Sequence, residues 1–223
     1  MDLSEARIVV LAENQYQELE LWYPVLRFRE AGSDVLIVAP RAGQLYSSKL
    51  GLPVVSDLDP GSLDAADIDA LIIPGGFAPE AMRKSPELLE LVRKTYDGRG
   101  IVAAICHAGW VLASTGIAEG RRLTCVPIIR DDVIHAGGEY VNEAVVRDGN
   151  LITSRLPNDL PLFCAEIITA LGELTGHRGD GSSWPGPGTP RASAGYKVAA
   201  ELVQAPAGRA TANYTTTAAL AGG

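Results

Sequence analysis

Cysteine is scarce in this chain of 223 residues, which holds only Cys106, Cys125 and Cys164. An odd number of widely spaced cysteines favours reduced thiols, because disulfide frameworks and structural zinc sites need cysteines in close pairs. We therefore expect no metal centre and a reducing compartment.

Long apolar runs and an excess of positive charge are also missing. No apolar run approaches the roughly 18 residues of a membrane-spanning helix, and the chain enters a strand pattern at 7–11 without the apolar region of a signal peptide. The formal net charge is −8, from 27 acidic and 19 basic residues. Nucleic acid and anionic membranes are therefore not expected partners. The lack of a signal-peptide pattern and of a membrane-spanning run makes the cytoplasm the expected location.

Apolar strand patterns alternate with helical patterns along the first 176 residues. Strand-like runs cover 7–11, 34–39, 69–73, 101–105, 123–126, 140–146 and 151–154, and helical patterns cover 19–31, 85–96, 131–136 and 160–171. The opening strand, helix and strand predict an α/β fold with a mainly parallel sheet. Asp148-Gly149-Asn150 predicts an antiparallel hairpin, residues 43–55 a small β excursion, and Pro24 a kink or a first helical turn.

The last 47 residues have a different composition. Of residues 177–223, 31 are Gly, Ala, Ser, Thr or Pro. Such a segment buries too little apolar surface to offset the entropy lost on ordering. The sequence thus predicts an α/β domain over 1–176 and a mobile tail over 177–223.

A buried strand at 101–105 leads directly into Cys106, His107, Ala108 and Gly109. Small residues allow a tight turn from strand to helix, which exposes its central side chain as a nucleophile elbow does. A helix N-terminus would also favour the thiolate of Cys106. The alternative is a free cysteine packed in the core.

Three further residues are candidates for a site with Cys106. Glu20 lies on an otherwise apolar helical face, where a carboxyl group beside a thiol would have a shifted pKa and could donate a hydrogen bond or act as a general acid or base. It could equally be a solvated helical glutamate. Gly75 and Gly76 follow a strand end, and their N–H groups could form an oxyanion hole or simply a turn.

Seven motifs, in this order and spacing, resemble the ThiJ/PfpI superfamily over residues 6–174. They are Glu-Leu-Glu-Leu-Trp-Tyr-Pro (18–24), Pro-Gly-Gly-Phe-Ala-Pro-Glu (74–80), Ala-Ile-Cys-His-Ala-Gly (104–109), Arg-Asp-Asp (130–132), Gly-Gly-Glu-Tyr-Val (137–141), Asp-Gly-Asn-Leu-Ile-Thr-Ser-Arg (148–155) and Pro-Asn-Asp-Leu-Pro (157–161). The resemblance implies a flavodoxin-like α/β sandwich without metal or organic cofactor. It also implies a homodimer or a larger homo-oligomer.

The resemblance further implies a nucleophilic Cys106 whose thiol is touched by Glu20. In the protease-like branch a histidine follows the cysteine and is oriented by a glutamate of a neighbouring subunit, and the matching residues are His107 and Glu80. His107 could instead be a surface or interface histidine. Glu80 could instead be a first-turn glutamate favoured by the helix dipole.

The chain departs from the superfamily pattern at Gln17, where an acidic residue is common, and at Val126, where a tyrosine is common. The substrate is therefore left open. One hypothesis is an enzyme of stress protection, in which Cys106 attacks small carbonyl electrophiles or their adducts. The alternatives are a redox-responsive stress or chaperone-like protein whose cysteine is oxidised without turnover, and a small-molecule hydratase.

Overall fold

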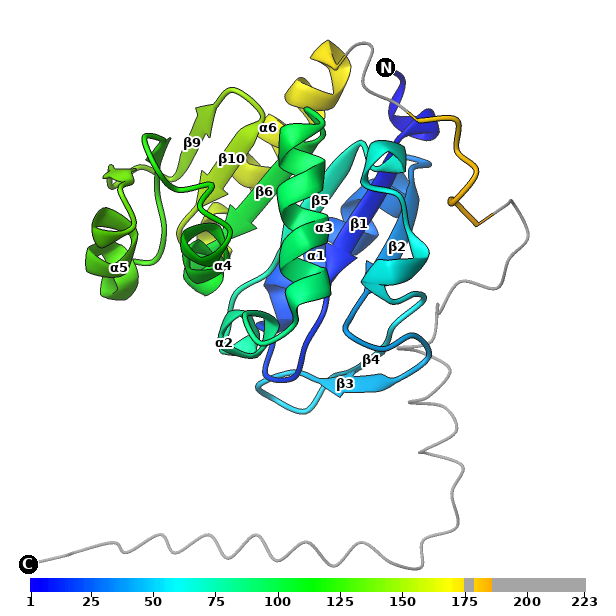
Figure 1. Cartoon of the computed structure of the whole chain (residues 1–223), viewed down its shortest axis with the longest axis horizontal. Coiled ribbons are helices and arrows are strands. Elements are labelled where there is room, and N and C mark those ends of the chain that lie inside the picture. The colour runs from blue at the N-terminus through cyan, green and yellow to red at the C-terminus, as the bar shows by residue number, and fades with distance from the viewer. Residues whose placement is uncertain (175–178, 186–223) are drawn as a thin grey trace, which may run out of the picture.

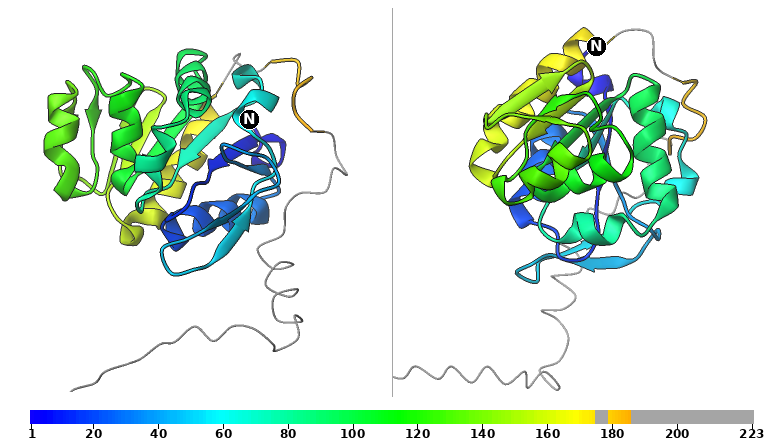
Figure 2. Two further views of the ribbon diagram at one scale, coloured as in Figure 1. Left: turned by 60° about the horizontal axis from the view of Figure 1, so that its bottom comes forward. Right: turned by 60° about the vertical axis from the view of Figure 1, so that its left-hand side comes forward.

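The computed structural model describes residues 1–174 and 179–185. These residues form a six-stranded sheet with helices on both faces (Figure 1). Helices α1 (Glu18–Glu30) and α6 (Leu160–Glu173) contact each other on one face, and α3 (Pro86–Asp97) covers the other (Figure 2). The predicted flavodoxin-like α/β fold is confirmed.

The sheet has the strand order β2-β1-β5-β6-β10-β9, in which only β9 is antiparallel to its neighbour. The strands are β1 (Arg7–Leu11), β2 (Asp34–Val38), β5 (Ala70–Ile73), β6 (Ile101–Ile105), β9 (Val145–Asp148) and β10 (Leu151–Ser154). Strands β5 and β6 are buried throughout, as expected for parallel strands covered on both faces. Their carboxyl ends meet at one edge of the sheet, where a ligand site is expected.

Two small sheets lie outside the main one. The excursion predicted at 43–55 is an antiparallel hairpin of β3 (Leu45–Ser47) and β4 (Pro53–Val55). The strand predicted at 123–126 is shorter and shifted, since β7 (Arg122–Leu123) pairs in parallel with β8 (Glu139–Tyr140). The single strand predicted at 140–146 was therefore wrong. Its first residue, Tyr140, belongs to β8, which pairs with β7, whereas its last residues belong to β9, which pairs with β10.

The helices begin largely where the sequence predicts. Ser85 caps α3 by accepting a hydrogen bond from the Leu88 N–H, and Pro86 occupies the first helical position, as its fixed φ favours. Pro24 lies inside α1, beyond its first turn. The remaining helices are α2 (Ala78–Met82), α4 (Gly109–Ser114) and α5 (Arg130–His135). No helix in the described ranges is long and apolar enough to cross a membrane.

Residues 179–185, here called the C-terminal strap, lie against the edge of the sheet at which the parallel strands begin. The buried carboxylate of Asp67 accepts hydrogen bonds from the Gly181 N–H at 2.7 Å, the Ser183 N–H at 3.1 Å and the Ser183 hydroxyl at 2.6 Å. The Trp184 indole N–H donates to Asp34 at 2.9 Å. Gly181 has φ +80°, and a side chain there would meet the Arg7 guanidinium.

The strap differs from the mobile tail predicted for this stretch. The composition of the tail indicates only how much apolar surface it could bury. The strap is instead held by amide, hydroxyl and indole groups that donate hydrogen bonds to carboxylates. Charge-assisted hydrogen bonds of this kind are strong. Residues 186–223 lie outside the described residues. The domain boundary at 176 therefore stays a prediction.

Two truncations test the strap. A chain ending at Pro185 keeps the strap and should melt like the full chain. A chain ending at Gly176 leaves the buried Asp67 with fewer donors, and should lose about 1–3 kcal/mol of unfolding free energy, which is the usual effect of unsatisfying a buried polar group. Thermal and urea unfolding of both chains measure the difference. Equal stability of the two would contradict the strap's role.

Candidate active site

Cys106 lies directly after β6, at the carboxyl edge of the sheet. Its φ of +63° is in the left-handed region, which is strained for a residue with a side chain and typical of a functional turn. A short 3-10 turn, Cys106–Ala108, leads into α4. The predicted tight turn from strand to helix is present, and the carbonyl of Cys106 accepts the Val126 N–H at 3.3 Å.

Glu20 is fully buried in the first turn of α1. Its Oε2 accepts the Gly75 N–H at 2.7 Å, while its Oε1 is buried without a hydrogen-bond partner among the described residues. The Gln17 side chain caps α1 by accepting the Glu20 N–H at 2.8 Å. Gln17 therefore fills the position of the common acidic residue with a neutral cap.

Gly75 allows this carboxyl group to approach the thiol. A Cβ atom on Gly75 would lie 2.6 Å from the Cβ of Cys106 and 2.7 Å from Oε2 of Glu20, distances that no side chain tolerates. Its N–H was predicted to serve an oxyanion hole, but it already donates to Glu20. Gly76 and His107 instead present their backbone N–H groups to the sulfur of Cys106.

The carboxyl and thiol groups titrate against each other. Burial raises the pKa of Glu20 to about 7, although hydrogen bonds from Gly75 and Cys106 lower it. Burial, followed by the charge of Glu20, raises the pKa of Cys106 to about 12. A helix N-terminus alone lowers the pKa of a thiol only modestly, and here burial and the charge of Glu20 act against it. Near neutral pH the pair holds at most one negative charge.

His107 reaches the sulfur. Its Nδ1 lies 3.4 Å from Sγ of Cys106, although the residue directly after the nucleophile was expected to point its side chain away from the thiol. The ring contacts Phe77 and Trp110, with centroid distances of 6.0 and 5.1 Å. Burial and, to a smaller extent, Lys49 lower the pKa of His107, so the imidazole is neutral near pH 7.

Glu80 stands apart from this cluster. It lies exposed in the first turn of α2, and its role across a subunit contact stays a prediction. The sequence analysis missed Phe77, Trp110 and Lys49. The first two directly follow the Gly-Gly and Cys-His-Ala-Gly motifs, so their aromatic character was a usable signal, whereas nothing in the sequence links Lys49 to Cys106.

The other titratable groups offer no second centre in the ranges that the structure describes. Among those residues no group of three or more His, Cys, Asp or Glu side chains could hold a metal ion. Cys125 and Cys164 are buried, and burial raises the pKa of each thiol to about 12. Unlike Cys106, neither has a histidine nitrogen or a carboxyl hydrogen bond at its sulfur in the contacts described.

Known proteins are similar to this chain in sequence and in fold. The DJ-1/PfpI family matches residues 6–170. A deglycase of Pyrococcus abyssi is 38% identical over 165 residues, covering 74% of this chain and 99% of that protein. Protein/nucleic acid deglycase 2 of Escherichia coli is 35% identical over 168 residues, covering 74% and 98%. The crystal structure of Drosophila melanogaster DJ-1beta superposes with a TM-score of 0.69 at 29% identity, covering 76% and 95%.

The chain belongs to the DJ-1/PfpI family. The resemblance predicted from the seven motifs is thereby confirmed. The C-terminal strap lies beyond the residues that the family model matches.

The raised pKa of Glu20 predicts a pH-dependent stability. The pKa of Glu20 in the folded protein, about 7, exceeds its ordinary value of 4.5. The protonated carboxyl group therefore stabilises the fold fully at pH values below 4.5, and this stabilisation is lost as the pH rises through about 7. Relative to Glu20→Gln, which cannot ionise, the wild type should lose about 2–3 kcal/mol of unfolding free energy between about pH 5 and about pH 8. Urea titrations of both proteins measure this difference. A constant difference across the range would show that Glu20 ionises as freely as in solvent.

Proposed function

We propose that this protein is a cysteine-dependent enzyme of the deglycase or protease-like type, acting in stress protection on small carbonyl electrophiles or their adducts. The observation that carries the proposal is the convergence on one sulfur of a buried carboxyl group, an imidazole nitrogen and two backbone N–H groups. The deglycase names of relatives from Pyrococcus abyssi and Escherichia coli support it.

The reaction begins with Cys106 in its thiol form. As Sγ attacks the electrophilic carbon, its proton passes to the Glu20 carboxylate, whose pKa of about 7 suits a base at neutral pH. The S–C bond forms as the carbonyl π pair moves to oxygen, and the proton held by Glu20 then passes to that oxygen to give a hemithioacetal. The N–H groups of Gly76 and His107 stabilise the negative charge that the sulfur carries between the loss of its proton and the formation of this bond.

His107 is placed to move the second proton. Its neutral imidazole lies 3.4 Å from Sγ. With an amide substrate, the tetrahedral adduct expels its amine, which takes the proton held by Glu20, and an acyl-thioester remains. The neutral imidazole then accepts a proton from the water that attacks this thioester and passes it to the departing sulfur. That hydrolysis consumes one water and returns the Cys106 thiol and a carboxylic acid. Contacts with the aromatic rings of Phe77 and Trp110 limit the orientations of His107.

The redox alternative is less favoured by the surroundings of Cys106. Oxidant-sensing cysteines are accessible thiols with a low pKa, whereas Cys106 is 8% exposed and burial raises its pKa to about 12. Base-assisted attack on a bound electrophile does not need a standing thiolate, so the same features are compatible with catalysis.

Turnover separates these functions. Wild-type protein should convert the adduct of methylglyoxal with N-acetylcysteine, Cys106→Ser should not, and Glu20→Gln should lose about 10²–10⁴-fold, the usual contribution of general acid–base catalysis. Cys164→Ala, which removes a buried thiol in α6, is the matched control and should retain activity. Turnover that survives in Cys106→Ser would refute the proposal. Peroxide oxidation of Cys106 without turnover would favour the redox alternative.

We further propose that the protein is a cytoplasmic homo-oligomer. Helix α1 supports self-association, because the side chains of Leu19 and Leu26 are each 55% exposed and apolar surface of this kind favours contacts. Light scattering should therefore give a mass of at least two chains at micromolar concentration. A monomer would also remove the predicted role of Glu80 across a subunit contact.

A further inference from the structure

Lys49 is held near the candidate site by backbone hydrogen bonds. It follows β3, and its N–H donates to the Tyr16 carbonyl at 3.0 Å. The Gln15 N–H donates to Ser47 at 2.7 Å, and the Gln15 carbonyl accepts the Phe77 N–H at 2.9 Å. One loop therefore binds both the β3–β4 hairpin and the turn beside Cys106, which fixes the backbone of Lys49 relative to the sulfur.

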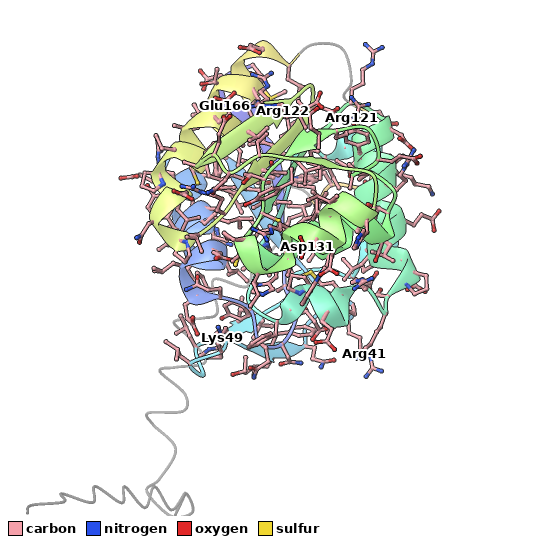
Figure 3. All side chains as sticks on the ribbon, turned by 90° about the vertical axis from the view of Figure 1, so that its left-hand side faces the viewer. Arg41, Lys49, Arg121, Arg122, Asp131 and Glu166 are labelled. Atoms are coloured by element: carbon pink, nitrogen blue, oxygen red, sulfur yellow. The ribbon has the colours of Figure 1, made fainter. Side chains whose placement is uncertain are left out.

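The side chain of Lys49 continues this connection. Its Nζ lies 4.9 Å from the ring centroid of Phe77, a distance that permits a cation–π interaction. Phe77 is 6.0 Å from the ring of His107, whose Nδ1 is 3.4 Å from Sγ of Cys106. Figure 3 shows Lys49 at the hairpin end of the molecule, away from Arg121, Arg122 and Glu166.

The charge of Lys49 is available to a ligand. The side chain is exposed and forms no ion pair within the described ranges. The carboxylate of Glu18 accepts the Leu50 N–H at 2.6 Å. Its pKa is lowered, against the effect of burial, by hydrogen bonds from Ser48 and Leu50 and by the charge of Lys49, so Glu18 opposes the attraction of an anion to Lys49 without forming an ion pair with it. Lys49 also contributes to lowering the pKa of both Glu20 and His107, so its field reaches the site.

The other charges described around the site are of the opposite sign to Lys49. Trp110, which contacts His107, donates its indole N–H to Asp132 at 2.7 Å, so the charged group beside that ring is a carboxylate. The chain as a whole carries a net charge of −8. The positive charge of Lys49 beside the Phe77 ring thus contrasts with the negative charge of the chain as a whole. A charged group fixed in this way beside a binding site selects ligands of the opposite charge.

We propose that Lys49 and Phe77 form an anion subsite next to Cys106, so that the preferred electrophile carries a carboxylate close to its reactive carbon. This inference rests on the proposed function in taking Cys106 as the nucleophile. It adds the class of substrate, which is an acidic carbonyl compound or the adduct of an acidic metabolite.

Two alkylating reagents of the same shape test the subsite. Iodoacetate and iodoacetamide both form an S–C bond with loss of iodide, and they differ only in carrying a carboxylate or a neutral amide. Lys49→Met should slow alkylation of Cys106 by iodoacetate about two- to five-fold more than by iodoacetamide, the range expected for one exposed ion pair. Lys49→Arg should preserve the wild-type ratio of the two rates.

The extent of alkylation is measured from the intact mass of the protein. Labelling of Cys125 and Cys164 is measured in the Cys106→Ser variant and subtracted. Lys94→Met is the control of equal charge, because Lys94 lies on α3 paired with Glu90 at 2.7 Å, and it should leave the ratio unchanged.

Three outcomes overturn the subsite. An equal change with both reagents would mean that Lys49 affects only the reactivity of the sulfur. The same effect from Lys94→Met would mean that net charge alone is responsible. A Cys106 that neither reagent labels would overturn the subsite together with the proposed function. Because alkylation needs no turnover, a charge-selective Cys106 in a protein without turnover would leave the subsite standing and remove only the proposed enzyme.

Discussion

The candidate site depends on one buried contact, between the Glu20 carboxyl group and the Gly75 N–H beside Cys106. A carboxyl group in this position is poorly hydrated, so its pKa rises to about 7. It can then exchange a proton with a thiol under neutral conditions. The absence of a side chain at Gly75 makes the approach possible, and the positive φ of Cys106 turns the thiol toward it. The close packing of Glu20 against Gly75 and Cys106 therefore determines both the position of the carboxyl group and its raised pKa.

Much of the fold could be predicted from local patterns. The apolar runs at β1, β5 and β6 identify buried parallel strands, and Ser85-Pro86 identifies the start of α3. Patterns fail where pairing is decided by contacts that are distant in sequence. The stretch from 139 to 148 divides between two sheets, because β7 offers a partner to its first residues and β10 to its last. No periodicity records such a choice.

The site was predictable in composition and less so in arrangement. The motifs around Cys106 and Gly75 identify the residues, and the buried Glu20 follows from its apolar neighbours. The role of each group cannot be predicted from the motifs. The Gly75 N–H donates to Glu20 instead of to an oxyanion. Burial raises the pKa of the Cys106 thiol, which a helix N-terminus was expected to lower. Lys49 approaches only because loop 14–17 joins two distant turns. Such contacts depend on tertiary structure.

The C-terminal strap lies at the edge of the sheet where β1 and β2 begin, whereas Cys106 lies at the edge where β6 ends. The N-terminal amine of Met1 lies near the end of α6, where it donates to the Gly172 carbonyl at 3.3 Å. The strap and Cys106 therefore lie at opposite edges of the same sheet. A fluorophore attached to the strap itself, at the exposed Ser182, would report on unfolding without occupying the edge at which a reagent meets the sulfur.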